Sequence, residues 1–273
     1  MPQIQITCDT PDSQIYYSIN NANLDQLYSG PFNAENGNVI KAIGKKDGYD
    51  NSEISEFKVP QLINVIVGNT YTIDGIEVFC IKEGQAYTTV NNVLIDDGTL
   101  PEVTEHPIFV DKNHDLVWYI EGNDFVDQIG GPNPYYINDT YKYGYEWGNK
   151  NTKIINTNIE AGLENTNSLI TLNLQPKESE WYVIWDKVTE ARNKIGSNKW
   201  FVPSKDELNL IYENKNNLNN LSLNNTSTCF YWSSSEYTSN VGYYAWGQYF
   251  LSGFQYYYYK DSHSIRVRLC RQI

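Results

Sequence analysis

The sequence lacks the features that mark several large classes of protein. Its apolar runs stay shorter than the roughly 18 residues that a membrane-spanning helix requires, and no basic segment with an apolar stretch behind it opens the chain. We therefore expect no membrane insertion and no Sec-type signal peptide. With four cysteines, three histidines and no CxxC pair in 273 residues, we expect neither a disulfide scaffold nor a structural zinc site.

Motifs that carry chemistry are also scarce. No Ser-His-Asp or Cys-His arrangement, phosphate loop or dinucleotide fingerprint is visible, so we expect a protein that is not an enzyme and has no cofactor. For Asp111, His114 and Asp115, a polar hairpin turn is favoured over a metal site because no set of partner ligands is visible. Cys229 and Cys270 are expected to be unpaired buried thiols, with a structural disulfide as the alternative. Solvated acids are favoured over a calcium site in the acidic loop, which contains Asp96, Asp97, Glu102 and Glu105.

The charges and the composition are uneven. The chain has 33 acidic and 20 basic residues and a formal net charge of -13, which repels phosphate backbones, so we expect no nucleic-acid partner. Of the 33 asparagines only Asn240 falls within residues 230–273, where 14 of the 44 residues are aromatic. This stretch also carries two acids and four bases. A Tyr-rich, Asn-poor end therefore follows an acidic, Asn-rich body.

Residues 4–59 have the pattern of a small β-sandwich. Apolar and polar residues alternate over short runs such as 4–8 and 15–19, and turn signals such as Lys46-Asp47-Gly48 separate the runs. The segments that match a known family are Ile6-Thr7-Cys8, Thr10-Pro11, Ile15-Tyr16-Tyr17-Ser18, Tyr28-Ser29-Gly30-Pro31-Phe32, Ile40-Lys41-Ala42 and Gly48-Tyr49. They resemble the fibronectin-III-like repeats found near the C-termini of chitobiases and other surface glycoside hydrolases. Because such repeats usually act as spacers, we expect a spacer domain at residues 1–60.

The middle of the chain predicts hairpins. Residues 64–90 are predicted to form a hairpin, in which Asp74-Gly75 turns between 71–73 and 76–81 and a second turn at Glu83-Gly84 leads to 86–90. A second hairpin is expected to join 108–110 to 116–120, and a long ordered loop is expected over 121–153.

Two helices are predicted after these hairpins. Apolar residues recur at three- and four-residue spacing over 179–195, and Gly196 ends that run. Ser204 and Glu207 form a capping box at the start of the second helix. The rest of the chain is expected to form strands with aromatic-rich connections.

Several ordered segments between residues 105 and 273 match a second family. They are Val110-Asp111-Lys112-Asn113-His114-Asp115-Leu116, Tyr143-Gly144-Tyr145-Glu146-Trp147-Gly148, Gly162-Leu163-Glu164-Asn165-Thr166-Asn167, Lys199-Trp200-Phe201-Val202-Pro203-Ser204-Lys205-Asp206-Glu207-Leu208, Tyr231-Trp232-Ser233-Ser234-Ser235-Glu236, Ala245-Trp246, Phe250, Gly253 and Arg266-Val267-Arg268. Together they resemble the C-type-lectin-fold domain of variable proteins encoded by diversity-generating retroelements. The expected fold is therefore an α+β C-type lectin fold over residues 61–273, preceded by a small all-β immunoglobulin-like sandwich.

This resemblance implies a constant frame and a hypervariable segment at about 237–265. In that family an error-prone reverse transcriptase randomises adenines copied into the gene's 3′ end, and the favoured Asn codons cannot become Lys, Glu, Gln, Met or Trp. The implied frame is Ala245, Trp246, Gln248, Phe250, Gly253, Gln255, Lys260, Arg266, Val267 and Arg268. The implied variable, ligand-binding positions are Tyr243, Tyr244, Gly247, Tyr249, Leu251, Ser252, Phe254, Tyr256, Tyr257, Tyr258, Tyr259, Asp261, Ser262, His263 and Ser264. None of these holds one of the five excluded residue types.

The composition of the tail suits recognition. Tyrosine offers a large, rigid, amphipathic contact area, and small Ser and Gly beside it allow close approach, as in antibody paratopes. An ordinary aromatic β-core is the alternative interpretation. We expect a diversified receptor-binding or adhesin protein that recognises a protein or glycan ligand on a host cell surface or in the environment.

Two other functions stay open. One is a fixed-specificity carbohydrate-binding module of a surface protein, and the other is a retained enzyme fold with an unrecognised active site. Extracellular display on a phage tail or on a bacterial cell surface is expected, with a homotrimer if the chain is the tip of a tail fibre.

Overall fold

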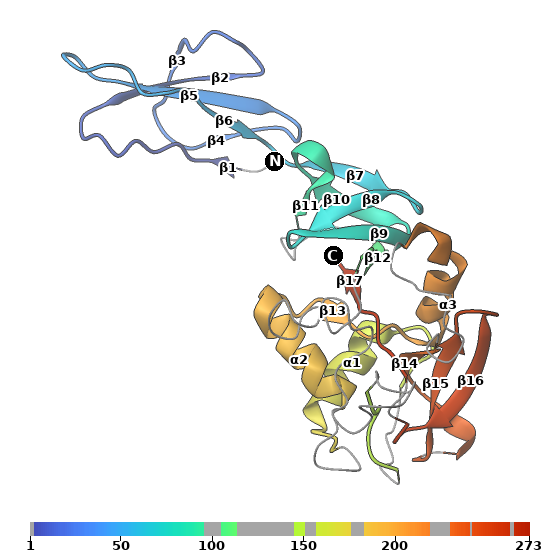
Figure 1. Ribbon diagram of the computed structural model, residues 1–273. Coiled ribbons are helices and arrows are strands. Elements are labelled where there is room, and N and C mark those ends of the chain that lie inside the picture. The colour runs from blue at the N-terminus through green and yellow to red at the C-terminus, as the bar shows by residue number, and fades with distance from the viewer. Residues whose placement is uncertain are drawn as a thin grey trace. The chain divides into compact units, whose positions relative to one another are not determined.

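The computed structural model describes residues 3–95, 105–113, 145–150, 157–175, 183–218, 230–240, 242–262 and 265–273. Strands predominate and helices are few, as Figure 1 shows. The chain divides into two compact units, which are Met1–Asn64 with Gln85–Val103 and Val65–Gly84 with Thr104–Ile273. The predicted domain boundary after residue 60 stays a prediction.

Residues 3–65 form strands without a helix, which is compatible with an immunoglobulin-like or fibronectin-III-like domain in the N-terminal unit. Its main sheet has the order β3-β2-β5-β6, and β2 pairs with β5 in antiparallel register from Gln14↔Lys45 to Ile19↔Ile40. Beside this sheet, β1 pairs with β4. The bounds are β1 Gln3–Ile4, β2 Gln14–Ile19, β3 Gln26–Leu27, β4 Phe32–Asn33, β5 Val39–Lys45 and β6 Ser55–Lys58.

Alternation along these strands builds a small core. The inward residues are Ala34, Ile40 and Val59, with Ile4, Ile6, Ile19 and Phe32 packed against them. A separate three-stranded sheet has the order β11-β10-β7. Its elements, with a short 3₁₀ helix η1, are β7 Gln61–Val65, β10 Gly84–Thr88, η1 Val90–Asn92 and β11 Leu94–Ile95.

The C-terminal unit contains a five-stranded antiparallel sheet of order β13-β17-β12-β9-β8. The predicted hairpin around Asp74-Gly75 is confirmed as β8–β9, and both turn residues have positive φ, as a type I′ turn requires. The strand predicted at 108–110 is present as β12, while its expected partner at 116–120 lies outside the described residues. The bounds are β8 Thr70–Ile73, β9 Ile76–Lys82, β12 Ile108–Asp111, β13 Trp200–Phe201 and β17 Cys270–Gln272.

In the described part of this unit the chain forms three α-helices, namely α1 Gly162–Thr171, α2 Ile184–Ile195 and α3 Lys205–Glu213. The two predicted helices are confirmed. Gly196 ends α2 in the left-handed conformation, and the Ser204–Glu207 capping box opens α3. The predicted residues 179–182 of α2, and nearly all of the loop expected at 121–153, lie outside the described residues. Among the described helices, none has the length and apolar character needed to cross a membrane.

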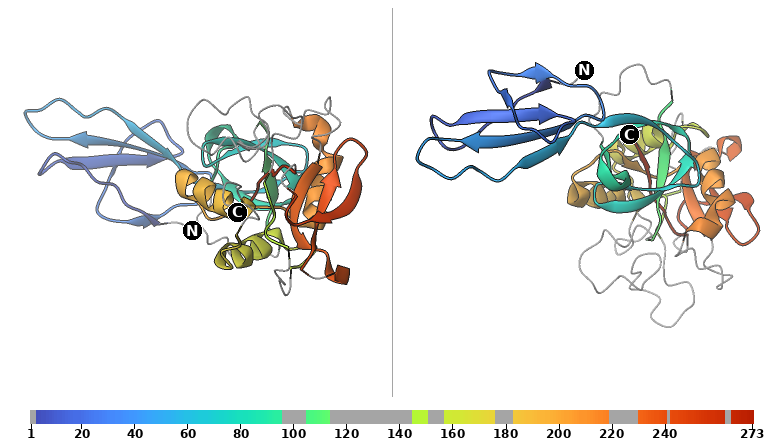
Figure 2. Two further views of the ribbon diagram at one scale, coloured as in Figure 1. Left: turned by 60° about the horizontal axis from the view of Figure 1, so that its bottom comes forward. Right: turned by 90° about the horizontal axis from the view of Figure 1, so that it is seen from above.

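The last sheet has the order β14-β15-β16 and lies beside α3. Figure 2 shows this sheet and α2 at opposite sides of the unit in both views. The bounds, with short 3₁₀ helices η4 and η6, are η4 Lys215–Asn217, β14 Phe230–Glu236, η6 Thr238–Asn240, β15 Tyr244–Tyr249 and β16 Phe254–Tyr259. The core beneath it joins Phe79, Ile81, Ile108, Val110, Phe201, Leu208, Ile211, Leu218, Tyr231, Phe250 and Cys270.

Candidate functional site

The β15–β16 hairpin carries most of the predicted site. The register runs from Tyr244↔Tyr259 to Tyr249↔Phe254, so the hairpin is regular along its whole length. Successive side chains of a strand point to opposite faces. Tyr244 and Trp246 of β15 therefore lie on one face of the hairpin, together with their partners Tyr259 and Tyr257 on β16. Tyr249 and its partner Phe254 lie on the other face.

Aromatic rings cover both faces of this hairpin. We call the set the aromatic surface. On one face the ring of Tyr237, which follows β14, stacks on Tyr257 at 4.1 Å between centroids. On the other face Phe254 stacks on Tyr256 at 5.6 Å. The full set is Phe230, Tyr237, Tyr243, Tyr244, Trp246, Tyr249, Phe254, Tyr256, Tyr257, Tyr258 and Tyr259.

The two faces meet around the outer edge of β16. Tyr256 and Tyr257 are neighbours in the chain and start on opposite faces, yet their rings stack at 4.4 Å with an angle of 17°. Since β15 occupies the inner side of β16, the rings can meet only around the outer side. The aromatic surface is therefore continuous from one face to the other.

Two lysines from outside the hairpin border the aromatic surface. The Lys205 ammonium lies 5.0 Å from the ring centroid of Trp246, and the Lys150 ammonium lies 4.1 Å from that of Tyr259. Lys150 also pairs with Asp261 at 2.9 Å. Lys205 is paired in turn with Asp206 at 3.6 Å. Each lysine is within the range of a cation–π interaction with a ring of the surface, and each has an aspartate as its counter-ion.

Three tyrosines of the aromatic surface have pKa values above the ordinary value. A hydrogen bond with Tyr259 raises the pKa of Tyr244 to about 12, and burial raises the pKa of Tyr258 well above its ordinary value. A hydrogen bond with Tyr256 raises the pKa of Tyr257. These hydroxyls therefore remain protonated and can donate as well as accept hydrogen bonds from a ligand.

A buried ion pair fixes the ends of the hairpin. The Lys260 ammonium donates to Glu236, both side chains are almost fully buried, and Glu236 also accepts the N–H of Gly242 at 3.0 Å. Burial lowers the pKa of Lys260, and the hydrogen bond to Glu236 opposes that shift. The backbone N–H of Lys260 donates to the backbone carbonyl of Tyr243 at 3.0 Å. The hairpin is thus closed by side-chain and backbone bonds at the same point.

Buried tryptophans hold the segment behind the hairpin. The indole N–H of Trp147 donates to the carbonyl of Ser233 at 2.8 Å, and that of Trp185 donates to the carbonyl of Trp147 at 2.7 Å. The indole N–H of Trp232 donates to the carbonyl of Tyr145 at 2.8 Å. Each large ring is therefore buried without leaving its polar atom unpaired.

The tip of the hairpin is fixed against α3. The Gln248 side-chain amide donates to Asn209 at 2.8 Å and to the carbonyl of Gly253 at 3.0 Å. Gly253 has a φ of +81°, and a Cβ there would lie 2.4 Å from the ring of Tyr212. Only glycine fits this position, because both the backbone conformation and the space exclude a side chain.

The predicted variable positions and the predicted frame differ in burial. Of the thirteen variable positions that the structure describes, only Gly247 is buried, whereas seven of the ten frame positions are. A Cβ on Gly247 would lie 3.0 Å from the carbonyl oxygen of Tyr231 and 3.2 Å from the ring of Tyr258. Variation at this one position is therefore restricted. His263 and Ser264 lie outside the described residues.

Sequence reasoning misses parts of the surface. Tyr237 is not among the predicted binding positions, and Trp246 is assigned to the frame although it is partly exposed between Tyr244 and Gln248. Strand alternation with Tyr244 is the signal that places Trp246 on the aromatic face. For Lys205, which reaches the surface from α3, no signal in the sequence indicates the contact.

The other candidate groups form no comparable site among the described residues. There, no group of three or more His, Cys, Asp or Glu could hold a metal ion. Asp111 is the last residue of β12, where it is buried and accepts the N–H of Asn113 at 3.0 Å, and the predicted polar turn stays a prediction. His114 and Asp115, like the acids at 96, 97 and 102, lie outside these residues. Cys270 is a free buried thiol whose pKa burial raises far above its ordinary value, and Cys229 is not described.

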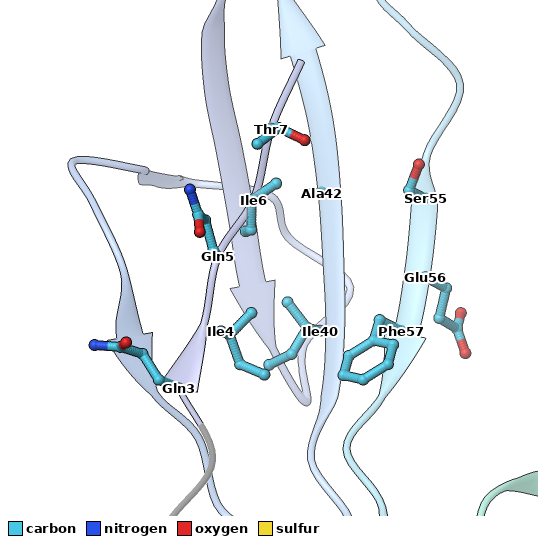
Figure 3. Close-up of a pocket in the computed structure, with 10 residues that line it drawn as sticks. All are labelled: Gln3, Ile4, Gln5, Ile6, Thr7, Ile40, Ala42, Ser55, Glu56 and Phe57. Atoms are coloured by element: carbon cyan, nitrogen blue, oxygen red, sulfur yellow. The ribbon is translucent and has the colours of Figure 1, made fainter. Parts of the chain in front are cut away.

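The N-terminal unit has a shallow apolar groove of about 360 Å³. In Figure 3 the side chains of Ile4, Ile6, Ile40 and Phe57 line it, between the chain after β1 and the strands β5 and β6. The groove holds few polar groups that could orient a small ligand. The candidate site therefore stays on the aromatic surface.

Two family models match separate parts of the chain. Residues 108–271 match the model of the Lcl C-terminal domain, and residues 4–59 match that of the Fn3-associated domain. Both are binding or adhesin families rather than enzymes. No curated protein matches the chain. The matches confirm the resemblance to variable proteins of diversity-generating retroelements with a fibronectin-III-like region in front, and the chain belongs to the Lcl C-terminal domain family.

Proposed function

We propose that this protein is a diversified receptor-binding protein or adhesin, and that its aromatic surface binds the ligand. Under this proposal the C-terminal unit has a C-type lectin fold. The ligand is a protein or a glycan on a host or environmental surface, and the protein is displayed on a phage tail or on a bacterial cell. The constant frame holds the backbone while the codons of the exposed positions vary.

One observation carries the proposal. The family frame rests on sequence alone, yet it separates buried positions such as Gln248, Phe250 and Lys260 from exposed positions such as Phe254 and Tyr256. Exposed side chains contribute little to stability, so they can change without unfolding the protein. A surface that is to be randomised needs this separation.

The chemistry of the surface supports binding. Phe254 is 60% exposed and Tyr256 is 41% exposed, and both belong to one continuous group of stacked rings. Large exposed apolar patches on soluble proteins mark interaction sites, and aromatic anchors supply much of the energy of interfaces. The tyrosine hydroxyls add hydrogen-bonding groups that can adapt to different ligands.

A fixed carbohydrate-binding module is the second candidate. The partly exposed ring of Trp246 beside Lys205 has the form of an aromatic platform with a fixed polar neighbour. A sugar site of this kind would keep the same residues in every isolate, so variation of the gene distinguishes the two functions.

The test is to sequence the 3′ end of this gene in many isolates and to read the flanking DNA. We expect differences confined to the codons of the predicted variable positions, a near-copy of the segment nearby and a reverse transcriptase gene. The codons for Trp246, Phe250 and Gly253 should be constant. An identical 3′ end in all isolates, with no near-copy, would refute diversification, and glycan screening with Trp246→Ala as the control would then follow.

A further inference from the structure

Strand β6 lies at the edge of the main sheet of the N-terminal unit, and the proposed function gives it no role. In the sheet order β3-β2-β5-β6, β6 has a neighbour on one side within the described residues. Every residue of β6 is exposed, and Phe57 is 52% exposed although it faces the apolar groove (Figure 3). An exposed strand edge beside apolar surface is a template for pairing with another strand.

The register of β6 shows which backbone groups are available. The Val59 N–H donates to the carbonyl of Asn38 at 2.7 Å, which marks the pair 38/59 as hydrogen-bonded. Hydrogen-bonded pairs alternate in antiparallel sheets, so the pair Ile40↔Phe57 is also bonded. The backbone groups of Glu56 and Lys58 therefore point away from β5, toward the open side.

When two copies of β6 run antiparallel to each other, their charges are complementary. If a second copy pairs antiparallel about Phe57, Glu56 faces Lys58 of the second copy and Lys58 faces its Glu56. These are the residues whose backbone groups point outward, so charge pairing and hydrogen bonding require the same register. The two Phe57 rings then face each other over the groove, where close non-hydrogen-bonded pairs favour aromatic contact.

We propose that β6 is a dimer interface, and that two copies of this chain join their N-terminal sheets by antiparallel pairing of β6 about a two-fold axis. Charged residues usually protect an edge strand against pairing. Here their order, acid–Phe–base, turns the same charges into pairs that fix one register. A two-fold interface closes at two copies, and two binding surfaces on one particle would increase avidity for a multivalent ligand.

The experiment is sedimentation velocity on the full chain over a concentration series. We expect the wild type to dimerise reversibly. Glu56→Lys and Lys58→Glu should each weaken dimerisation by about tenfold or more, because each places like charges opposite each other twice. An equimolar mixture of the two variants should form dimers again, since every lysine of one variant then faces a glutamate of the other.

Controls separate this interface from general effects of charge and folding. Asp47→Lys makes the same charge change as Glu56→Lys away from β6 and should leave dimerisation unchanged. Phe57→Ser should weaken the dimer, whereas Tyr49→Ser, which removes an exposed ring elsewhere in the unit, should not. A misfolded variant could not be rescued by mixing, so recovery in the mixture reports the interface itself.

Three results would overturn the proposal. They are a wild type that stays monomeric over the whole series, a trimer, and a mixture of the two variants that stays monomeric. None of them affects the proposed function, because dimerisation through β6 does not depend on whether the C-terminal hairpin is diversified.

Discussion

The β15–β16 hairpin and the buried segments behind it differ in their exposure to water. Both are rich in aromatic residues. Behind the hairpin, Trp147, Trp185 and Trp232 are fully buried and each indole N–H has a backbone acceptor. On the hairpin, rings such as Phe254 and Tyr256 are exposed and stack mainly on one another. Aromatic content alone therefore does not distinguish a core from a binding surface, whereas satisfied polar atoms and burial do.

The exposed hairpin is held in place by a few bonds at its ends and its tip. The hairpin is fixed at its ends by Lys260 and Glu236, and at its tip by Gln248 and Gly253. Its exposed side chains contribute few of these bonds. The comparison predicts large effects on stability at the fixing points and small effects on the exposed rings.

The largest effect is expected from Glu236→Ala. This change removes the carboxylate that pairs with the buried Lys260 ammonium, which should lower the free energy of unfolding by about 3–5 kcal/mol. The partly exposed pair of Lys112 and Glu77 is the control, and Glu77→Ala should cost less than about 1 kcal/mol. Urea unfolding of both variants measures the difference, and equal losses would contradict the distinction between frame and surface.

The free energy of unfolding of the Glu236→Ala variant should depend on pH. Burial already lowers the pKa of Lys260, and loss of the carboxylate should lower it further. The folded protein then binds fewer protons than the unfolded chain, so the free energy of unfolding should rise with pH up to the ordinary lysine pKa of about 10.4. The difference in the free energy of unfolding between wild type and variant could instead stay constant from neutral pH to about pH 10.4. That result would show that the loss of Glu236 does not destabilise the charged form of Lys260.

A smaller effect is expected from Gly253→Ala at the tip. Gly196 has a nearly identical φ of +80° and open space within 4 Å of the point where a Cβ would lie, whereas a Cβ at Gly253 would collide with Tyr212. Gly196→Ala should therefore cost about 1–2 kcal/mol for the left-handed conformation, and Gly253→Ala about 1–3 kcal/mol more for overpacking. Thermal unfolding compares them, and equal costs would mean that Tyr212 moves aside freely.

A still smaller effect on stability is expected from the double variant Phe254→Ser with Tyr256→Ser. Both side chains are exposed, so the free energy of unfolding should fall by less than about 1 kcal/mol. Phe250 is buried at the other end of the same turn, and Phe250→Ser should cost at least about 3 kcal/mol. Calorimetry of the two proteins tests the contrast, which fails if the exposed pair costs as much as the buried ring.

The smallest effect is expected from Tyr259→Phe, which should leave stability at neutral pH almost unchanged. It removes the hydrogen bond that raises the pKa of Tyr244 to about 12, so the pKa of Tyr244 should fall toward the ordinary value of about 10. Ultraviolet titration of the tyrosines measures this shift, with Tyr49→Phe as the control. An unaltered titration would show that the two hydroxyls do not interact.

Local signals predict much of the fold. The capping box of Ser204 and Glu207, the left-handed Gly196 and the Asp74-Gly75 turn each act over a few residues, and the structure confirms all three. Helix α1 escapes prediction because its buried side includes Asn165 and Thr166. These two side chains donate hydrogen bonds to Ser234 and to the carbonyl of Val202, which are distant in the sequence. The spacing of apolar residues within the helix therefore does not indicate that they are buried.

The candidate site is predicted less completely than the fold. The family frame indicates which positions are exposed, but it does not indicate which rings touch. Tyr237 joins the surface because β14 pairs with β15, and Lys205 joins because α3 begins beside Trp246. Both contacts arise from tertiary packing between segments that are separate in sequence.

The closure of the hairpin at Lys260 and Tyr243 also has a consequence in polymer terms. The entropy lost on closing a loop depends mainly on its length and only weakly on the residues within it. The bonds that close this loop belong to Glu236, Lys260 and the backbone. Every sequence of the same length between these points would therefore start from nearly the same entropic cost of closure, and differences between variants would arise from their side chains alone.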